Sequence, residues 1–394
     1  NTIVNVFIIA FQVFSMGAII LISHYKGAKN FAGEKSVYSV AFVLSTILGI
    51  TISLILLCFS EYFFTWIKLD PTCMEKGLIY IRIVGGCLFL QAILTTLSAF
   101  LKSNSYMKDS TIINAVINGL NILGNFILIP HLGIMGVAIA SVASRAIGVI
   151  IISIVFLKKI QVNIFRHPLR DFSSATMKKI LLIGGPAGGE ALSYNASQIL
   201  ILFVVNGLGN KGLVNIKSYA SMFAMLSYMF TSAISQAMQV VLGELLGMGK
   251  IEESKRKVYQ TLIAGIISAL ILSSILYFIS DYAYGIFGIT DKELLHIGKM
   301  ILLIDIALEL GRAFNIVFVR ALQTSGDILF PTILSVIFCW SVAVLGSFVL
   351  GGKNVWLNMG LIGVWIAMAS DECIRAIIFL IRFKRGAWER KIIL

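Results

Sequence analysis

The sequence predicts an all-α, polytopic membrane protein built from two parallel six-helix bundles. Of its 394 residues, 58% are hydrophobic and only 13% are charged, whereas a soluble domain carries about 25% charged residues. The apolar residues gather in blocks of about 20, the length of a helix that crosses a bilayer. The chain also repeats part of its own sequence, as duplicated helical membrane proteins do.

Eleven apolar segments are expected to span the membrane. They lie at about 3–23, 37–59, 78–101, 111–129, 134–157, 180–207, 218–243, 258–279, 294–319, 331–350 and 360–383. The five cysteines have no paired spacing, and no Cys/His ligand cluster occurs. No structural metal and no cofactor are therefore expected.

The repeat relates the two halves of the chain. Gly133–Ala140 returns as Gly360–Ala367, with five of eight positions identical, and Leu101–Val116 returns in outline as Leu322–Ile337. Spans 1 to 5 thus correspond to spans 7 to 11, while the sixth span has no partner. We expect a fold of twelve transmembrane helices whose first helix is missing ahead of Asn1. Such duplication is typical of secondary transporters, and six helices per half make the repeats parallel.

This correspondence predicts the domain boundaries. They are an N-terminal lobe over 1–157, a linker over 158–179, a C-terminal lobe over 180–383 and a basic tail over 384–394.

The basic residues predict the orientation. The net charge is +13, and 20 of the Lys and Arg residues lie in connections on the side of the linker and tail, against 7 on the other side. Cytoplasmic loops carry such an excess, so the linker and the C-terminus should be cytoplasmic. The basic character then reflects orientation and contact with the lipid bilayer, and no nucleic-acid partner is expected.

Ionisable residues within the spans are the candidates for chemistry. Each costs about 2.5–3.5 kcal/mol in a bilayer on insertion scales, so it faces a cavity or a partner. The second half carries five acids within its spans and the first half carries none. The candidates for cation or proton coupling are Glu190, Asp305, Glu309 and Arg312, with Asp371, Glu372 and Arg375 as secondary candidates.

Glu190 follows the run Gly-Gly-Pro-Ala-Gly-Gly over 184–189, which should weaken the helix and free backbone carbonyls near the acid. Such a discontinuity could help Glu190 hold H⁺ or Na⁺. The alternative is a helix kink with a buried, protonated glutamate. Tyr194, Ser197 and Gln198 should extend one polar face from Glu190 and line a substrate cavity.

Asp305, Glu309 and Arg312 are spaced by four and three residues and therefore share a helical face. Glu309 and Arg312 can form a pair that protonation or a ligand would open, or a static salt bridge. Asp371 and Arg375, four residues apart, are expected to neutralise each other as a structural pair.

Further polar and aromatic residues could line a substrate cavity. Asn118 and Asn121 belong to an asparagine stripe, which interhelical hydrogen bonding also explains. Met225 and Tyr228 could contact aromatic cations, although most such residues must face lipid.

Several short motifs occur in an order that resembles one known family, the multidrug and toxic compound extrusion (MATE) transporters. They are the turn Gly27–Asn30, Asn121-Ile122 before Gly133–Ala140, Gly326-Asp327 with Pro331, and the runs Glu309–Asn315 and Ala369–Arg375. The resemblance implies a bacterial plasma-membrane antiporter, acting as a monomer, that exports organic and often cationic compounds in exchange for H⁺ or Na⁺. The alternative is a flippase for a lipid-linked precursor. An enzyme is not expected, since no nucleophile motif and no nucleotide-binding loop occur.

Overall fold

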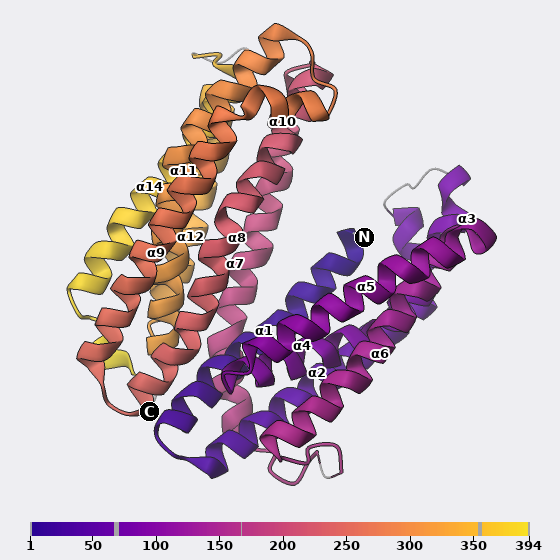
Figure 1. Ribbon diagram of the computed structural model, residues 1–394, viewed down its shortest axis with the longest axis vertical. Coiled ribbons are helices and arrows are strands. Elements are labelled where there is room, and N and C mark those ends of the chain that lie inside the picture. The colour runs from indigo at the N-terminus through magenta and orange to yellow at the C-terminus, as the bar shows by residue number, and fades with distance from the viewer. Residues whose placement is uncertain (1, 67–70, 167, 354–356, 393–394) are drawn as a thin grey trace. The chain divides into compact units, whose positions relative to one another are not determined.

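The structure is a computed structural model that describes residues 2–66, 71–166, 168–353 and 357–392. Figure 1 shows a chain of long helices joined by short connections. Every regular element in the described ranges is helical, so the predicted all-α class is confirmed. The chain divides into two compact units, Asn1–Gly188 (unit 1) and Gly189–Leu394 (unit 2), and the division falls inside one long helix, α7 (Ser174–Gly207).

Unit 1 contains the first five predicted spans. Its elements are α1 (Thr2–Gly27), α2 (Phe31–Trp66), α3 (Pro71–Tyr80), the π-helix η1 (Ile81–Gly85), α4 (Leu88–Ser103), α5 (Met107–Leu132) and α6 (Ile134–Ile160). Helix α4 packs against α1, α2, α5 and α6, and is therefore the central helix of this unit. The third predicted span is thus not one regular helix, because η1 interrupts it.

Unit 2 begins within α7. Its further elements are α8 (Lys211–Gly247), α9 (Ile251–Phe278), α10 (Ser280–Ile286), α11 (Lys292–Ser325), α12 (Leu329–Phe338), the π-helix η2 (Cys339–Val344), α13 (Leu345–Gly351), α14 (Gly360–Lys384) and the 3₁₀ turn η3 (Glu389–Lys391). Helix α11 packs against α8, α9 and α14, so the acids that α11 carries lie in the middle of the unit. The short helix α10 was not predicted from the sequence.

Six helices of the described chain are long and apolar enough to cross a membrane. They are Phe7–Gly27, Phe31–Tyr62, Met107–Leu132, Ile134–Ile160, Ile251–Phe278 and Leu329–Gly351, and a seventh span results if Met74–Gly85 and Leu88–Ser103, bent by 43°, count as one. Of the other predicted spans, α7, α8, α11 and α14 contain polar or charged residues that interrupt their apolar sequence. These helices carry most of the candidate site residues.

The glycine-rich run in α7 differs from the prediction, because residues 184–189 remain α-helical. A Cβ at Gly184 or Gly188 would collide with Val13 of α1, so these glycines allow two helices of unit 1 to pack closely. Pro186 lies within the helix and lacks an N–H, which leaves the carbonyl of Leu182 without its usual helical partner. The run therefore allows close packing and frees one carbonyl without breaking the helix.

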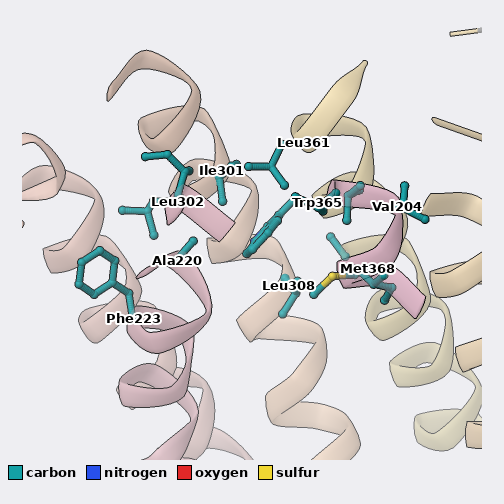
Figure 2. Packing of buried hydrophobic residues seen from close by; sticks show 14 of the residues in the cluster. Val204, Ala220, Phe223, Ile301, Leu302, Leu308, Leu361, Trp365 and Met368 are labelled. Atoms are coloured by element: carbon teal, nitrogen blue, oxygen red, sulfur yellow. The ribbon is translucent and has the colours of Figure 1, made fainter. Parts of the chain in front are cut away.

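Two apolar clusters hold unit 2 together. One surrounds Trp365 of α14, which is 1% exposed and lies among side chains of α11 such as Ile301 and Leu308 (Figure 2). The other joins α8, α9, α11 and α14, and it includes Trp388 from beyond the end of α14.

The residues after α14 fold back onto the unit, and we call 385–392 the C-terminal strap. Trp388 is 1% exposed, and its ring stacks on Phe383 with a centroid distance of 5.1 Å. The buried carboxylate of Asp327, in the α11–α12 turn, accepts hydrogen bonds from Arg382 of α14 at 2.9 Å and from Lys391 of the strap at 2.7 Å. The strap thereby joins α14 to the α11–α12 turn.

Helices α11 and α14 lie very close to each other at Gly311. A Cβ at this position would lie 2.8 Å from the main-chain carbonyl carbon of Glu372 and 2.9 Å from the amide nitrogen of Cys373. Gly311→Ala should therefore push the helices apart and destabilise the protein by about 1–3 kcal/mol, measured by thermal unfolding in detergent. Gly119→Ala is the matched control, since nothing lies within 4 Å of its added Cβ. Equal melting temperatures for the two variants would contradict the close approach.

Candidate charged site of the second unit

Buried ion pairs connect α11 and α14 in one network, which we call the charged network: Glu309, Arg312, Asp371, Glu372 and Arg375. Arg312 pairs with Glu309 on its own helix and lies 3.6 Å from Glu372 of α14. Arg375 bonds both oxygens of Asp371, at 2.9 and 2.6 Å, and also lies 3.2 Å from Glu372. The two pairs predicted from the sequence are therefore present, and Glu372 links them.

Glu372 is the central member of this network. Besides the two arginines, it has Asn315 of α11 as a neighbour, whose amide donates at 2.6 Å to its carboxylate and at 2.9 Å to its main-chain carbonyl. Residues three and four positions apart share a helical face, so Arg375 reaches Glu372 as well as Asp371. The three secondary candidates thus belong to the same charged network as Glu309 and Arg312.

One oxygen of Glu309 has no hydrogen-bond partner among the described residues. Its Oε1 pairs with Arg312, whereas its Oε2 is buried and forms no hydrogen bond with any described residue. The side chain of Glu309 is 1% exposed. A buried carboxylate oxygen without a donor is a place where a proton can bind, because protonation would remove the cost of an unsatisfied charge.

Asp305 lies one turn before Glu309 and outside these ion pairs. Its carboxylate accepts a hydrogen bond from the indole Nε1 of Trp365 at 3.2 Å, and both residues are buried. Arg312 lies within electrostatic range of Asp305 without forming an ion pair with it. The predicted face of α11 therefore holds Asp305, Glu309 and Arg312 together.

Two tyrosines lie beside Arg312. The guanidinium lies over the ring of Tyr228 of α8, 5.1 Å from its centroid, which is a cation–π arrangement. Tyr194 of α7 is 42% exposed, yet it lies within electrostatic range of Arg312 and Glu372. The aromatic and charged candidates thus meet at Arg312.

Glu190 lies on the α7 side of the same unit. Ser335 of α12, Arg375 and Glu372 lie within electrostatic range of its carboxylate, and no described residue forms an ion pair with it. On the next turns of α7, Trp340 donates to Ser193 at 2.7 Å and Cys339 lies 3.0 Å from the hydroxyl of Ser197. The predicted polar face of α7 is therefore divided: Glu190 and Ser197 face α12 and η2, while Tyr194 lies near Arg312.

The remaining cavity candidates are not part of the charged network. Asn121 of α5 donates to Ser141 of α6 at 3.2 Å, which is the interhelical hydrogen bonding considered as the alternative, and it accepts from Asn125 of its own helix at 3.1 Å. Asn118 is exposed on α5, Met225 is 44% exposed on α8, and Gln198 is half-buried on α7.

Two residues with a clear place in the site were not among the candidates, Asn315 and Trp365. Asn315 is three residues after Arg312, so helical spacing could have assigned it to the face of that arginine. Trp365 stands where the repeated motif of the first half has Ala138. That difference between the repeats was the available signal.

Comparison with known proteins agrees with the fold. The family model described as MatE matches residues 1–127 and 186–373. An uncharacterized transporter, YisQ of Bacillus subtilis, is 28% identical over 99% of this chain and 86% of its own length. A probable multidrug resistance protein, NorM of Thermotoga maritima, is 25% identical over 96% of this chain and 82% of its own length.

Solved structures give the same result for the fold alone. An outward-facing multidrug resistance MATE transporter of the MOP superfamily superposes with a TM-score of 0.88 at 19% identity, over 98% of this chain and 86% of that one.

Proposed function

Because the chain belongs to the MATE family of multidrug-efflux transporters, we propose that it exports organic cations and that inward movement of H⁺ drives the export. The chain is a transporter rather than an enzyme, and a multi-pass membrane protein. The coupling ion and the residues that bind it are our inference.

The observation that carries the proposal is the unpartnered Oε2 of Glu309 beside the Glu309–Arg312 pair. Protonation at this oxygen would weaken the pair, because a neutral carboxyl attracts a guanidinium less than a carboxylate does. Arg312 would then depend on Glu372, 3.6 Å away. A proton on Glu309 therefore changes the partner of an arginine that also lies over Tyr228.

Protons suit this network better than Na⁺ does. Sodium would have to bind among carboxylates that Arg312 and Arg375 already neutralise, and each guanidinium would repel a second cation. A proton adds to one oxygen without needing several oxygen ligands. Glu190 forms no described ion pair and is the remaining place where Na⁺ could bind.

The substrate and the proton would compete for the same carboxylates. An organic cation that displaced Arg312 from Glu309 and Glu372 could also take its place over the aromatic ring of Tyr228. Binding of the cation favours ionised carboxylates, and their protonation favours its release. Loading one solute thus displaces the other, which is the requirement for antiport.

The flippase alternative has less support. A site for the phosphates of a lipid-linked precursor should be rich in unpaired basic groups. The ionisable groups near or within the predicted spans that are gathered in unit 2 include five carboxyl groups, of Glu190, Asp305, Glu309, Asp371 and Glu372, and three guanidinium groups, of Arg312, Arg320 and Arg375. This excess of acids favours a cationic substrate.

The expected cellular setting follows from the charge bias. We propose a monomer in the bacterial plasma membrane, with the 158–179 linker and the C-terminus in the cytoplasm, because basic residues gather on that side. Small organic molecules and the surrounding lipid are then its partners.

A transport assay tests the proposal. In everted membrane vesicles containing the full-length protein, an acidic lumen should drive ethidium accumulation, and a Na⁺ gradient without a pH gradient should not. Glu309→Gln should abolish the accumulation driven by the pH gradient, because the variant has no carboxylate at that position to bind the proton.

Asp281→Asn is the matched control. Asp281 lies in the same unit but pairs with Lys299 at 3.6 Å in a more exposed position, so its loss should leave accumulation unchanged. Accumulation driven by Na⁺ alone would overturn the choice of H⁺, and full activity of Glu309→Gln would overturn the role of Glu309.

A further inference from the structure

The internal repeat provides a comparison for Trp365. Within the duplicated motif, Gly360–Ala367 matches Gly133–Ala140, and the sixth position is Trp365 in one copy and Ala138 in the other. Both residues are buried, at 1% and 0% exposure. A core position can therefore be filled by either side chain in this fold, so burial alone does not require tryptophan.

The partner of Trp365 differs between the halves as well. Extending the match of Leu101 with Leu322 back along the helix places Val84 opposite Asp305. Val84 lies in η1, and η1 packs against α6, the helix of Ala138. One half thus has two apolar residues where the other has an acid and an indole. The two differences form a pair, because the indole N–H of Trp365 is a hydrogen-bond donor and the carboxylate of Asp305 is an acceptor.

The geometry joins the two residues directly. The indole Nε1 of Trp365 donates to Oδ1 of Asp305 at 3.2 Å, from α14 to α11. Figure 2 shows the tryptophan ring among apolar side chains, including Leu361, Ile301 and Leu308. An isolated carboxylate in such surroundings is costly, and a donor to its charged form reduces this cost.

Few other groups act on Asp305 among the described residues. Glu309 and Arg312 lie within electrostatic range on α11, and Tyr284 of α10 is also within range. The hydroxyl of Tyr284 donates to the carbonyl of Gly298 instead. Helix α8 contributes the apolar Ala220 and Phe223 to this region. Trp365 therefore supplies the hydrogen bond to this carboxylate.

We propose that Trp365 is a positioning residue for coupling, and that it holds Asp305 as a second proton-binding carboxylate of the charged site. This rests on the proposed H⁺ coupling. When Asp305 is ionised, the indole N–H stabilises it in its apolar surroundings. When it is protonated, the bond weakens, and the charge next to Glu309 and Arg312 is reduced. Proton binding at Asp305 is thus linked to the Glu309–Arg312 pair one turn away.

The test is Trp365→Phe, which keeps an aromatic ring in the core and removes the N–H. Without this donor the carboxylate should hold its proton more tightly, so it ionises only at higher pH. We expect the midpoint of the pH profile of ethidium transport in everted vesicles to rise by about one pH unit. The melting temperature in detergent identifies any loss of folding.

Two controls separate positioning from packing. Trp340→Phe removes an indole N–H that bonds the neutral hydroxyl of Ser193, also in unit 2, and should leave the pH profile unchanged. Because transport itself needs Asp305, the second control measures the pH dependence of ethidium binding to the purified protein in detergent. Trp365→Phe should raise the midpoint of binding in the wild-type background and leave it unchanged in an Asp305→Asn background, where the titrating group is gone.

The outcomes distinguish this inference from the proposed function. If the wild-type protein shows no transport driven by a pH gradient, the proposed function fails. If the wild type shows such transport and Trp365→Phe has the same pH profile as the wild type, Trp365 only fills the core and the inference is overturned. A shift of the same size in the Asp305→Asn background would also overturn it.

Discussion

Arg312→Gln is expected to destabilise the protein by about 3–5 kcal/mol, the cost of removing one partner from a buried ion pair. Glu309, 1% exposed, would keep its negative charge and lose its cation. Glu309→Gln should cost only about 1 kcal/mol, because Arg312 would keep Glu372 at 3.6 Å and the ring of Tyr228. Thermal unfolding of the purified variants in detergent measures this difference. Equal losses of stability in the two variants would contradict the position of Arg312 between Glu309 and Glu372.

The double variant Glu309→Gln with Arg312→Gln separates stability from coupling. No unpaired charge remains in it, since Glu372 still has Arg375 at 3.2 Å and the amide of Asn315. We expect stability to recover towards that of the wild type. Ethidium transport should stay absent if the pair takes part in coupling. A folded double variant with full transport would show that the pair is only structural.

Glu190→Gln is expected to abolish coupled export with little effect on stability. Because no described residue forms an ion pair with Glu190, neutralising it leaves no charge without a partner. What is lost is an ionisable group near Arg375, Glu372 and Ser335. Ethidium accumulation by everted vesicles, under imposed H⁺ and Na⁺ gradients separately, measures the loss.

The two gradients also assign the ion at Glu190. Loss of only a Na⁺-driven component would place Na⁺ there, whereas loss of H⁺-driven accumulation agrees with our proposal. Normal accumulation by this variant under every gradient would remove Glu190 from the site. Ser193→Ala, one turn further along α7, is the control. It removes the hydrogen bond from Trp340 without removing a charge, so accumulation should stay unchanged.

Much of the fold could be predicted from the sequence, because a bilayer imposes a length and an apolar composition on each helix. The helical interruptions η1 and η2 could not, since π-helical turns depend on local packing and have no simple sequence signal. The expected discontinuity before Glu190 was wrong, because residues 184–189 remain α-helical. Gly184 and Gly188 are explained instead by their close packing against Val13.

The candidate site was predictable in part. Spacing along one helix identified Glu309 with Arg312 and Asp371 with Arg375, because residues three or four apart are neighbours. Spacing gives no information about which helices meet, so the position of Glu372 between two arginines depended on the packing of α11 against α14 at Gly311. The contact between Trp365 and Asp305 is hidden for the same reason.

The C-terminal strap has a consequence for the order in which the chain is made. A growing chain emerges from the ribosome with its N-terminus first, and domains fold in that order during synthesis. Trp388 and Lys391 emerge after every helix of the second unit that they contact, yet they complete an apolar cluster shared by four helices and supply one of the two cations that bond the buried Asp327. The second unit therefore cannot reach its final packing until these residues have been translated. A chain cut short by a premature stop codon after Lys384 would leave this apolar cluster incomplete and Asp327 with Arg382 as its remaining cation, a defect that cellular quality control is expected to recognise.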